Sequence, residues 1–116
     1  MPDVPKRVLV VDDEPAVRDL VTALLRNSGY VVETAPGGTE ALEKVEAGAF
    51  DVVFTDLVMP GMKGDQLARE IKTRRPTLPV VLLTGHKPAG LSTDFACILQ
   101  KPFTRDELRR TIASLV

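Results

Sequence analysis

The chain has 116 residues, of which 44% are hydrophobic and 27% are charged, and its formal net charge at pH 7 is −1. That length suits one compact domain, so we expect residues 1–116 to form a single unit. Acidic and basic residues are interspersed, a pattern that predicts no nucleic-acid surface. The single cysteine, Cys97, has no partner for an internal disulfide, and no long apolar span or signal-like N-terminus occurs. These features indicate a cytoplasmic chain without a membrane segment.

The N-terminal half predicts two strand–helix pairs. A valine-rich run at Val8 to Val11 is too short for a helix and predicts the first strand. The helix after it begins near Pro15 and ends at Gly29, residues that suit the first turn and the end of a helix. Its predicted apolar stripe comprises Val17, Leu20, Val21, Leu24 and Leu25. A second strand at Tyr30 to Val32 precedes a helix that ends at Gly48.

The C-terminal half continues the alternation. Three further strands are predicted at Val52 to Phe54, Val80 to Leu83 and Ala96 to Leu99. A helix with apolar positions at Leu67, Ala68 and Ile71 follows the first of them. The last helix runs from Thr104 to about Leu115, and Thr104 and Glu107 form its capping box. Only sixteen residues separate Thr84 from Lys101, several of them Gly, Pro or Ser, so we expect the helix between the last two strands to be short or missing.

Strict alternation of helices with strands that are apolar on both faces predicts an α/β fold with a covered parallel sheet. Such sheets bind ligands at the carboxyl ends of their strands. Polar residues follow those ends at Asp12, Asp13, Asp56, Thr84 and Lys101. Two unit charges about 4 Å apart repel by roughly 4 kcal/mol at an effective dielectric of about 20, so three carboxylates require a raised pKa or a bound cation. Hard oxygen ligands beside a phosphate suit Mg²⁺, with Mn²⁺ as a substitute.

Asp56 is the best candidate for a nucleophile that forms an acyl phosphate. It stands alone on its strand, whereas Asp12 and Asp13 form a pair suited to a metal. Lys101 would supply a point charge to the phosphoryl group and Thr84 a hydrogen bond. Taken singly, each residue also has a simpler interpretation: a helix cap or turn for Asp56, helix-terminal charge for the acidic pair, and solvated or strand-end groups for the others.

Four segments, VLVVDDE, TDLVMPG, VVLLTG and LQKPF, occur in this order and together resemble the signature segments of the response-regulator receiver domain of two-component signalling. The resemblance implies a flavodoxin-like (βα)5 three-layer sandwich with strand order 2-1-3-4-5. It implies that Asp56 accepts a phosphoryl group from a phosphohistidine, that Asp13 and the Val58 carbonyl bind Mg²⁺ with Asp56, and that Asp12 mainly holds metal-bound water. The bond between Lys101 and Pro102 is expected to be cis, as is usual in the family.

Other positions are expected to tune the site. Taken alone, His86 suits an ordinary loop histidine; the family resemblance implies instead that His86 and Val58 flank the path of the water that hydrolyses the acyl phosphate, and the small Gly85 would leave the phosphoryl group accessible. Ile98 stands where receivers usually carry Tyr or Phe, so the family's usual coupling through an aromatic side chain cannot operate here. The shortened segment before Lys101 is similar to receivers at the C-terminus of hybrid histidine kinases, and both a stand-alone regulator and such a domain stay open.

The resulting prediction is a phosphoacceptor switch, monomeric or weakly dimeric, that turns over no external substrate. Its phosphoryl donor would be a sensor histidine kinase or a phosphotransfer protein, and its effector would be another protein. Ile98 and the short segment leave a second prediction, a phosphorylation-independent binding module on a receiver scaffold. A third, an aspartate-nucleophile phosphatase of the haloacid dehalogenase type, would need an Asp-x-Asp motif after the first strand, where this chain has the adjacent Asp12 and Asp13.

Overall fold

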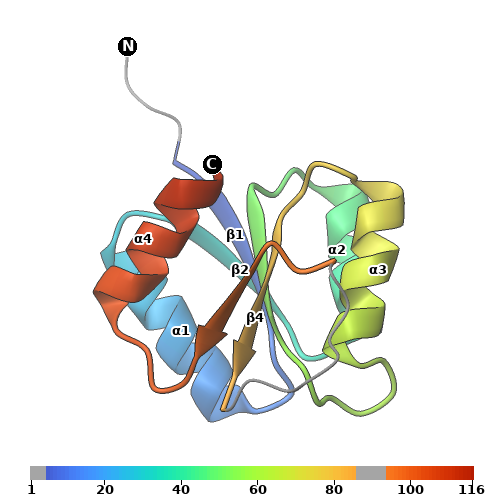
Figure 1. Cartoon of the computed structure of the whole chain (residues 1–116), viewed down its shortest axis with the longest axis horizontal. Helices are drawn as coiled ribbons and strands as arrows, with labels where there is room; N and C mark the ends of the chain where they lie inside the picture. The colour runs from blue at the N-terminus through green and yellow to red at the C-terminus, as the bar shows by residue number, and fades with distance from the viewer. Residues whose placement is uncertain (1–4, 86–93) are drawn as a thin grey trace.

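The computed structural model describes residues 5–85 and 94–116, and Figure 1 shows the arrangement of their helices and strands. The strands are β1 (Arg7–Val11), β2 (Val31–Ala35), β3 (Val52–Asp56), β4 (Val80–Thr84) and β5 (Cys97–Gln100). The helices are α1 (Pro15–Asn27), α2 (Gly38–Ala47), α3 (Gly64–Arg74) and α4 (Arg105–Leu115). Strand and helix alternate as predicted except between β4 and β5, where the described residues contain no helix.

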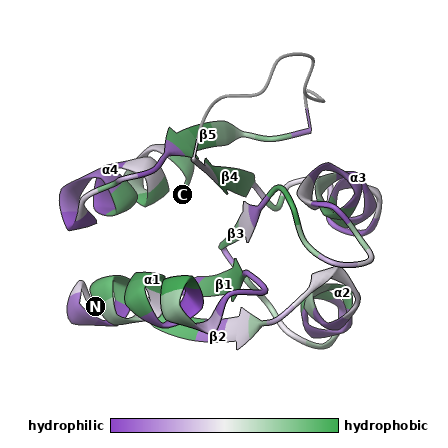
Figure 2. Cartoon of the chain, turned by 90° about the horizontal axis from the view of Figure 1, so that it is seen from below, coloured by the Kyte–Doolittle hydropathy of each residue, from purple (hydrophilic) through white to green (hydrophobic). Residues whose placement is uncertain are grey.

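The five strands form one parallel sheet in the order β2-β1-β3-β4-β5. Helices α1 and α4 lie on one face and α2 and α3 on the other, which gives the three layers seen in Figure 2. The α/β flavodoxin-like fold and its strand order are therefore confirmed.

Alternate residues of each central strand serve two separate cores. Val8 and Val10 pack on the face covered by α1 and α4, whereas Leu9 and Val11 pack on the face covered by α2 and α3. Phe54 is completely buried in the first of these cores. Burial on both faces explains why β1, β3 and β4 appear in the sequence as continuous apolar runs.

Two details of the N-terminal half differ from the prediction. Leu20 is 56% exposed, because α1 turns Val21 and Leu25 toward the sheet and successive helical residues are about 100° apart. Strand β2 runs to Ala35 and therefore includes the polar Glu33 and Thr34. Both are tolerated because β2 is an edge strand, and Glu33 forms ion pairs with Arg7 at 2.6 Å and Lys44 at 3.7 Å.

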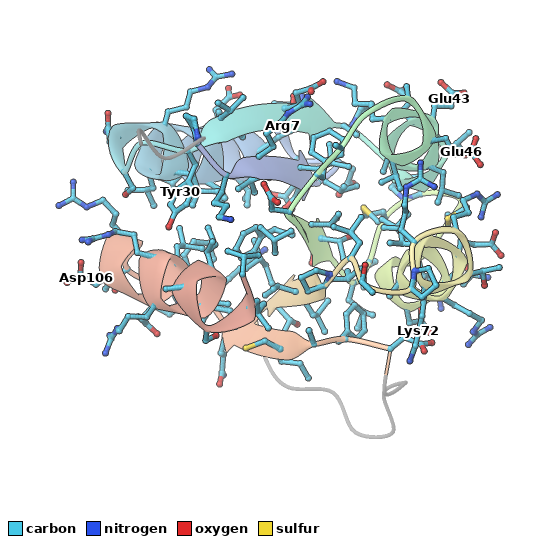
Figure 3. All side chains as sticks on the ribbon, turned by 90° about the horizontal axis from the view of Figure 1, so that it is seen from above. Arg7, Tyr30, Glu43, Glu46, Lys72 and Asp106 are labelled. Atoms are coloured by element: carbon cyan, nitrogen blue, oxygen red, sulfur yellow. The ribbon has the colours of Figure 1, made fainter. Side chains whose placement is uncertain are left out.

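Charged side chains lie on the outer surfaces of the layers. In Figure 3, Glu43, Lys72 and Asp106 point away from the sheet, in keeping with the interspersed charges of the sequence. In the part of the chain that the structure describes, no helix combines the length and the apolar character needed to span a bilayer.

Candidate functional site

The polar residues singled out in the sequence lie at one edge of the sheet. Asp12 directly follows β1, Asp56 is the last residue of β3, Thr84 is the last residue of β4 and Lys101 directly follows β5. All the strands are parallel, so their carboxyl ends share the edge that Figure 2 views end on. The fold thereby brings together side chains that are up to 89 residues apart in the sequence, from Asp12 to Lys101.

Three carboxylates form a tight cluster at this edge. Asp12, Asp13 and Asp56 each offer one oxygen, and these oxygens all lie within 4.8 Å of one another. Asp12 is only 2% exposed, whereas Asp13 and Asp56 are partly exposed. The backbone N–H of Leu57 donates to Oδ1 of Asp56 at 2.8 Å, which orients that carboxylate.

Asp12 has one satisfied and one unsatisfied carboxylate oxygen. Its Oδ1 accepts a hydrogen bond from the backbone N–H of Glu14 at 3.0 Å, but its buried Oδ2 has no hydrogen-bond partner in the part of the chain that the structure describes. The pKa of Asp12 is raised, and burial is the main cause. The negative charges of Asp56 and Asp13 raise it further, whereas the hydrogen bond from Glu14 and the positive charge of Lys101 lower it. A buried, unpaired oxygen among negative charges is an environment that a small divalent cation would complete, so the donor set fits Mg²⁺.

The loop after Asp56 is shaped by its own backbone. The N–H of Gly64 donates to the carbonyl of Leu57 at 2.8 Å, and Gly61 adopts a positive φ of 82° that favours glycine. Met59 is buried in the core under α2 and α3, while the side chain of Val58 is 71% exposed. The loop is thus fixed at its base and presents Val58 to solvent beside Asp56.

Thr84 and Lys101 are joined through the backbone. The N–H of Lys101 donates to the carbonyl of Thr84 at 2.7 Å, and the charge of Lys101 acts on Asp12 across the site. The peptide bond between Lys101 and Pro102 is cis. A Cβ at Gly85 would meet no atom of residues 5–85 and 94–116 within 4 Å, so these residues leave the end of β4 open. His86 lies outside the described residues.

Ile98 is partly buried in β5, opposite Leu82 of β4. Asp51 and Asp65, which the sequence analysis did not select, lie outside the cluster. Asp51 precedes β3 at the opposite edge and accepts from the backbone N–H of Arg7 at 2.8 Å, and Asp65 is in the first turn of α3.

The sequence analysis missed two residues that contact the site. The guanidinium of Arg18 donates to the backbone carbonyl of Asp12 at 3.0 Å, and Gly64 packs directly against the backbone of Asp56. The only signals were an arginine six residues after Asp12 and a glycine at the start of the predicted third helix, and neither reveals a contact without the fold.

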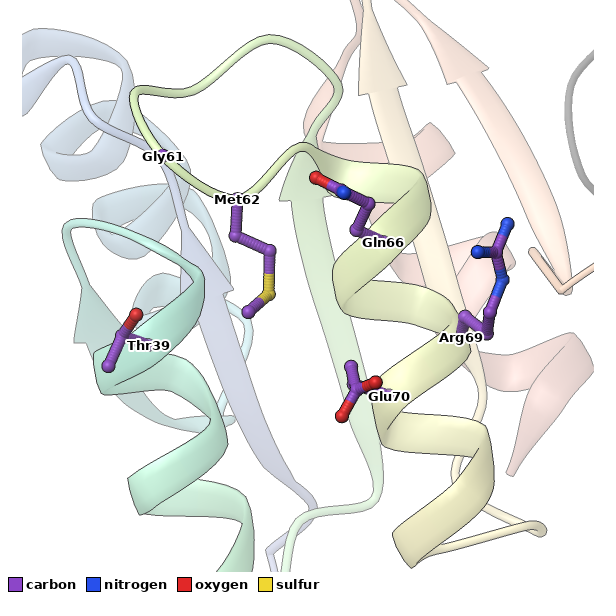
Figure 4. Close-up of a pocket in the computed structure, with 6 residues that line it drawn as sticks. All are labelled: Thr39, Gly61, Met62, Gln66, Arg69 and Glu70. Atoms are coloured by element: carbon purple, nitrogen blue, oxygen red, sulfur yellow. The ribbon is translucent and has the colours of Figure 1, made fainter.

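A separate hollow of about 450 Å³ lies between α2, α3 and the loop that precedes α3. Figure 4 shows the six residues that line it, Thr39, Gly61, Met62, Gln66, Arg69 and Glu70. None of them belongs to the acidic cluster. The hollow is thus distinct from the carboxyl-edge site.

The parallel sheet with helices on both faces defines a doubly wound α/β protein, and the three carboxylates at the carboxyl ends of its strands form a site of the kind that binds cations. The family model of the response regulator receiver domain matches residues 8–113, and the chain belongs to this family. The acidic pocket is consistent with the Mg²⁺-dependent phosphorylation of two-component signalling, and receiver domains interact with histidine kinases or phosphotransfer proteins.

Known relatives agree with this assignment. The response regulator MprA of Mycolicibacterium vanbaalenii is 35% identical over 117 residues, which cover 97% of this chain and 51% of MprA. The chain thus spans about half the length of the curated MprA relatives that it matches.

Two solved structures resemble the fold closely and contain magnesium. Response regulator TrrA of Thermotoga maritima, in complex with Mg²⁺-BeF, is 38% identical with a TM-score of 0.90, covering 96% of this chain and 99% of TrrA. The receiver domain of a sensor histidine kinase from Pseudomonas aeruginosa, with a magnesium ion in its active-site cleft, is 26% identical with a TM-score of 0.88 and covers 97% of this chain and 98% of that domain.

Proposed function

We propose that Asp56 is the phosphoacceptor of this receiver domain and that the donor is the phosphohistidine of a sensor kinase or phosphotransfer protein. One observation carries the proposal: Asp56 is a partly exposed member of a three-carboxylate cluster in which Oδ2 of Asp12 is buried and has no hydrogen-bond partner among the described residues. A cation that satisfies this oxygen leaves Asp56 at the solvent-facing side, where a donor can reach it.

In the proposed reaction, an Asp56 carboxylate oxygen attacks phosphorus. The new O–P bond forms as the N–P bond of the phosphohistidine breaks, and the leaving imidazole nitrogen keeps the electron pair and takes up a proton. Lys101 offsets the negative charge of the transferred group, and the hydroxyl of Thr84 donates a hydrogen bond to it. Positioning and charge neutralisation are the main demands of phosphoryl transfer, and these side chains meet both.

Asp12, Asp13, Asp56 and the Val58 carbonyl are the proposed Mg²⁺ ligands, with Asp12 acting mainly through metal-bound water. The bound ion supplies positive charge that lets these carboxylates stay ionised together and neutralises the phosphoryl oxygens. Mn²⁺, which also takes oxygen ligands, is the expected substitute. The described residues leave space at Gly85, which supports access of the phosphoryl group, and Val58 and His86 are the proposed neighbours of the hydrolytic water.

The same proposal covers the output of the domain. A phosphoryl group adds about −1.5 to −2 charges, which would change the contacts of this edge with a partner. The domain itself would catalyse only its own phosphorylation and dephosphorylation. Ile98 favours one competing function, a binding module that never becomes phosphorylated, because β5 lacks an aromatic side chain at that position.

Acetyl phosphate labelling followed by intact-mass measurement tests the proposal. With Mg²⁺ or Mn²⁺ the wild type should gain one phosphoryl group, and Asp56→Asn should gain none. Asp65→Asn is the matched control, because Asp65 is an acid in the first turn of α3 that lies outside the cluster. Removal of the cation with EDTA should abolish labelling of the wild type.

Three outcomes would contradict the proposal. Labelling of Asp56→Asn equal to wild type would move the phosphoacceptor elsewhere. A wild type that neither gains a phosphoryl group nor binds Mg²⁺ would instead support the phosphorylation-independent module. Multiple turnover of a generic phosphate ester would support the phosphatase.

A further inference from the structure

One arginine of α1 holds the loop that carries the two adjacent acids. Nη1 of Arg18 donates to the backbone carbonyl of Asp12 at 3.0 Å. That carbonyl belongs to the peptide unit joining Asp12 to Asp13, so the contact restrains the plane between two of the three clustered carboxylates. Within residues 5–85 and 94–116, Arg18 forms no ion pair with a carboxylate, and this carbonyl is the contact that engages its guanidinium.

The loop has few other restraints. Asp12 donates its N–H to the carbonyl of Ala35 at 3.2 Å and accepts from the N–H of Glu14 at 3.0 Å. Glu14, the N-cap residue of α1, makes no side-chain capping hydrogen bond. Side-chain caps commonly fix the entry of a chain into a helix by accepting from its first N–H groups. No such cap is present at Glu14, and the guanidinium of Arg18 instead restrains the carbonyl that precedes the helix.

The cluster needs such a restraint because its charges repel. Three carboxylate oxygens within 4.8 Å of one another favour an opened loop when no cation is bound. An opened loop must close again before the ligands converge, and this ordering weakens metal affinity. A guanidinium that fixes the Asp12 peptide opposes the opening and brings a positive charge to the same end of α1.

We propose that Arg18 is a positioning residue, which holds the Asp12–Asp13 peptide so that both carboxylates are preset for the divalent cation of the phosphoryl-transfer site. The inference rests on the proposed function of the acidic cluster. Arg18 itself touches neither the cation nor the phosphoryl group. Its contribution is to metal affinity, and it should disappear when the cation is saturating.

The same helix contains a matched control. Nη2 of Arg26 donates to the backbone carbonyl of Val32 at 3.1 Å, and in both pairs the arginine and the carbonyl are six residues apart. Val32 lies inside β2, away from the acidic cluster. Arg18→Met and Arg26→Met therefore remove the same kind of contact from α1, but only the first borders the site.

Calorimetric Mg²⁺ titration of the full chain tests the inference. We expect the Kd of Arg18→Met to rise by about tenfold, the range found when a residue that orients metal ligands is removed. Arg26→Met should stay within about twofold of wild type, and Arg18→Lys, which keeps one donor, should fall between. In acetyl phosphate labelling, Arg18→Met should need more Mg²⁺ for half-maximal rate and reach the wild-type rate at saturation.

A readout without metal separates positioning from general destabilisation. In EDTA, the Glu14 amide should exchange with deuterium faster in Arg18→Met than in wild type, while α1 amides beyond its first turn should keep their protection. If Arg18→Met does not fold, Arg18→Lys and Arg18→Gln carry the same comparison.

Equal Mg²⁺ affinity of Arg18→Met and wild type, or equal weakening by Arg18→Met and Arg26→Met, would overturn the inference alone. Failure of the wild type to bind Mg²⁺ would overturn the proposed function, and this inference with it.

Discussion

Gly64 fixes the backbone of Asp56, and substitution by alanine is the most direct test of how the fold positions the acceptor. A Cβ at Gly64 would overlap the carbonyl oxygen of Asp56 and lie 3.0 Å from Cα of Leu57 and 3.1 Å from the carbonyl carbon of Asp56. All three atoms belong to the backbone of the strand end. They cannot rotate away as a side chain would, so either the Asp56 peptide or the start of α3 must move.

The size of the effect follows from that geometry. Overpacking of a close-packed site typically costs about 1–3 kcal/mol, and the contact here is with rigid backbone, so we expect Gly64→Ala to lower the free energy of unfolding by about 2 kcal/mol. A displacement of about 1 Å at a reacting group can slow a reaction by about 10²-fold. We therefore expect the rate of phosphorylation by acetyl phosphate to fall by about 10²-fold even where the variant is fully folded.

Urea denaturation and time-resolved intact-mass measurement provide the two readouts. Gly48→Ala is the control, since the nearest atom to a Cβ there is the Lys44 carbonyl oxygen at an ordinary 3.5 Å. Gly38→Ala should be intermediate in stability, because its Cβ would meet Sδ of Met62 at 2.6 Å and Cβ of Met62 at 2.8 Å. The thioether can rotate away, whereas relief at Cβ requires a shift of the loop that carries Met62. Wild-type stability and rate in Gly64→Ala would refute the reasoning.

Two further predictions concern stability. Because burial raises the pKa of Asp12 above its ordinary 3.8, the folded state holds the proton more tightly than the unfolded chain, and metal-free stability falls as pH rises through the raised pKa. Asp12→Asn should therefore unfold at higher urea concentration than wild type in EDTA at pH 7, should lose this advantage below pH 3.8, and should gain less stability from added Mg²⁺. Thr104→Ala removes the hydroxyl that accepts from the N–H of Glu107 at 3.1 Å, so it should cost about 1 kcal/mol by urea denaturation. Thr73→Ala, which removes an exposed hydroxyl bonded within α3, should change stability by less than about 0.5 kcal/mol.

The acidic cluster could be predicted from the sequence because chain position alone determines it. Asp12, Asp56 and Lys101 each stand at or just after the end of a predicted parallel strand, and parallel strands share one carboxyl edge. The capping box of Thr104 and Glu107 was equally predictable, since it depends on four consecutive residues. In both cases the deciding interaction is local or follows from strand direction.

Features that depend on the packing of separate segments could not be predicted. Leu20 has the same spacing as its buried neighbours, and only the direction in which α1 faces the sheet leaves it exposed. The polar Glu33 and Thr34 suggested the end of a strand, but pairing with β1 continues the ladder to Ala35. Gly64 acts through the backbone of Asp56, eight residues earlier, and no sequence period indicates that approach.

An unpaired buried oxygen of the acidic cluster is also the strongest argument for function. Buried polar atoms usually have hydrogen-bond partners, and a buried unpaired oxygen costs stability. Among the described residues, Oδ2 of Asp12 has no partner, as is also true of Oγ1 of Thr22 and Oδ1 of Asp65, but only Asp12 belongs to the carboxylate cluster. The surrounding residues do not relieve this cost: Glu14 and Arg18 bond to the other acceptors of Asp12, its side-chain Oδ1 and its backbone carbonyl. These local contacts thus restrain the position of Asp12 but provide no hydrogen-bond donor to its Oδ2. A carboxylate held in place without a partner makes physical sense when a bound group pairs with its free oxygen. A divalent cation is such a group, and the neighbouring Asp13 and Asp56 would bind it as well.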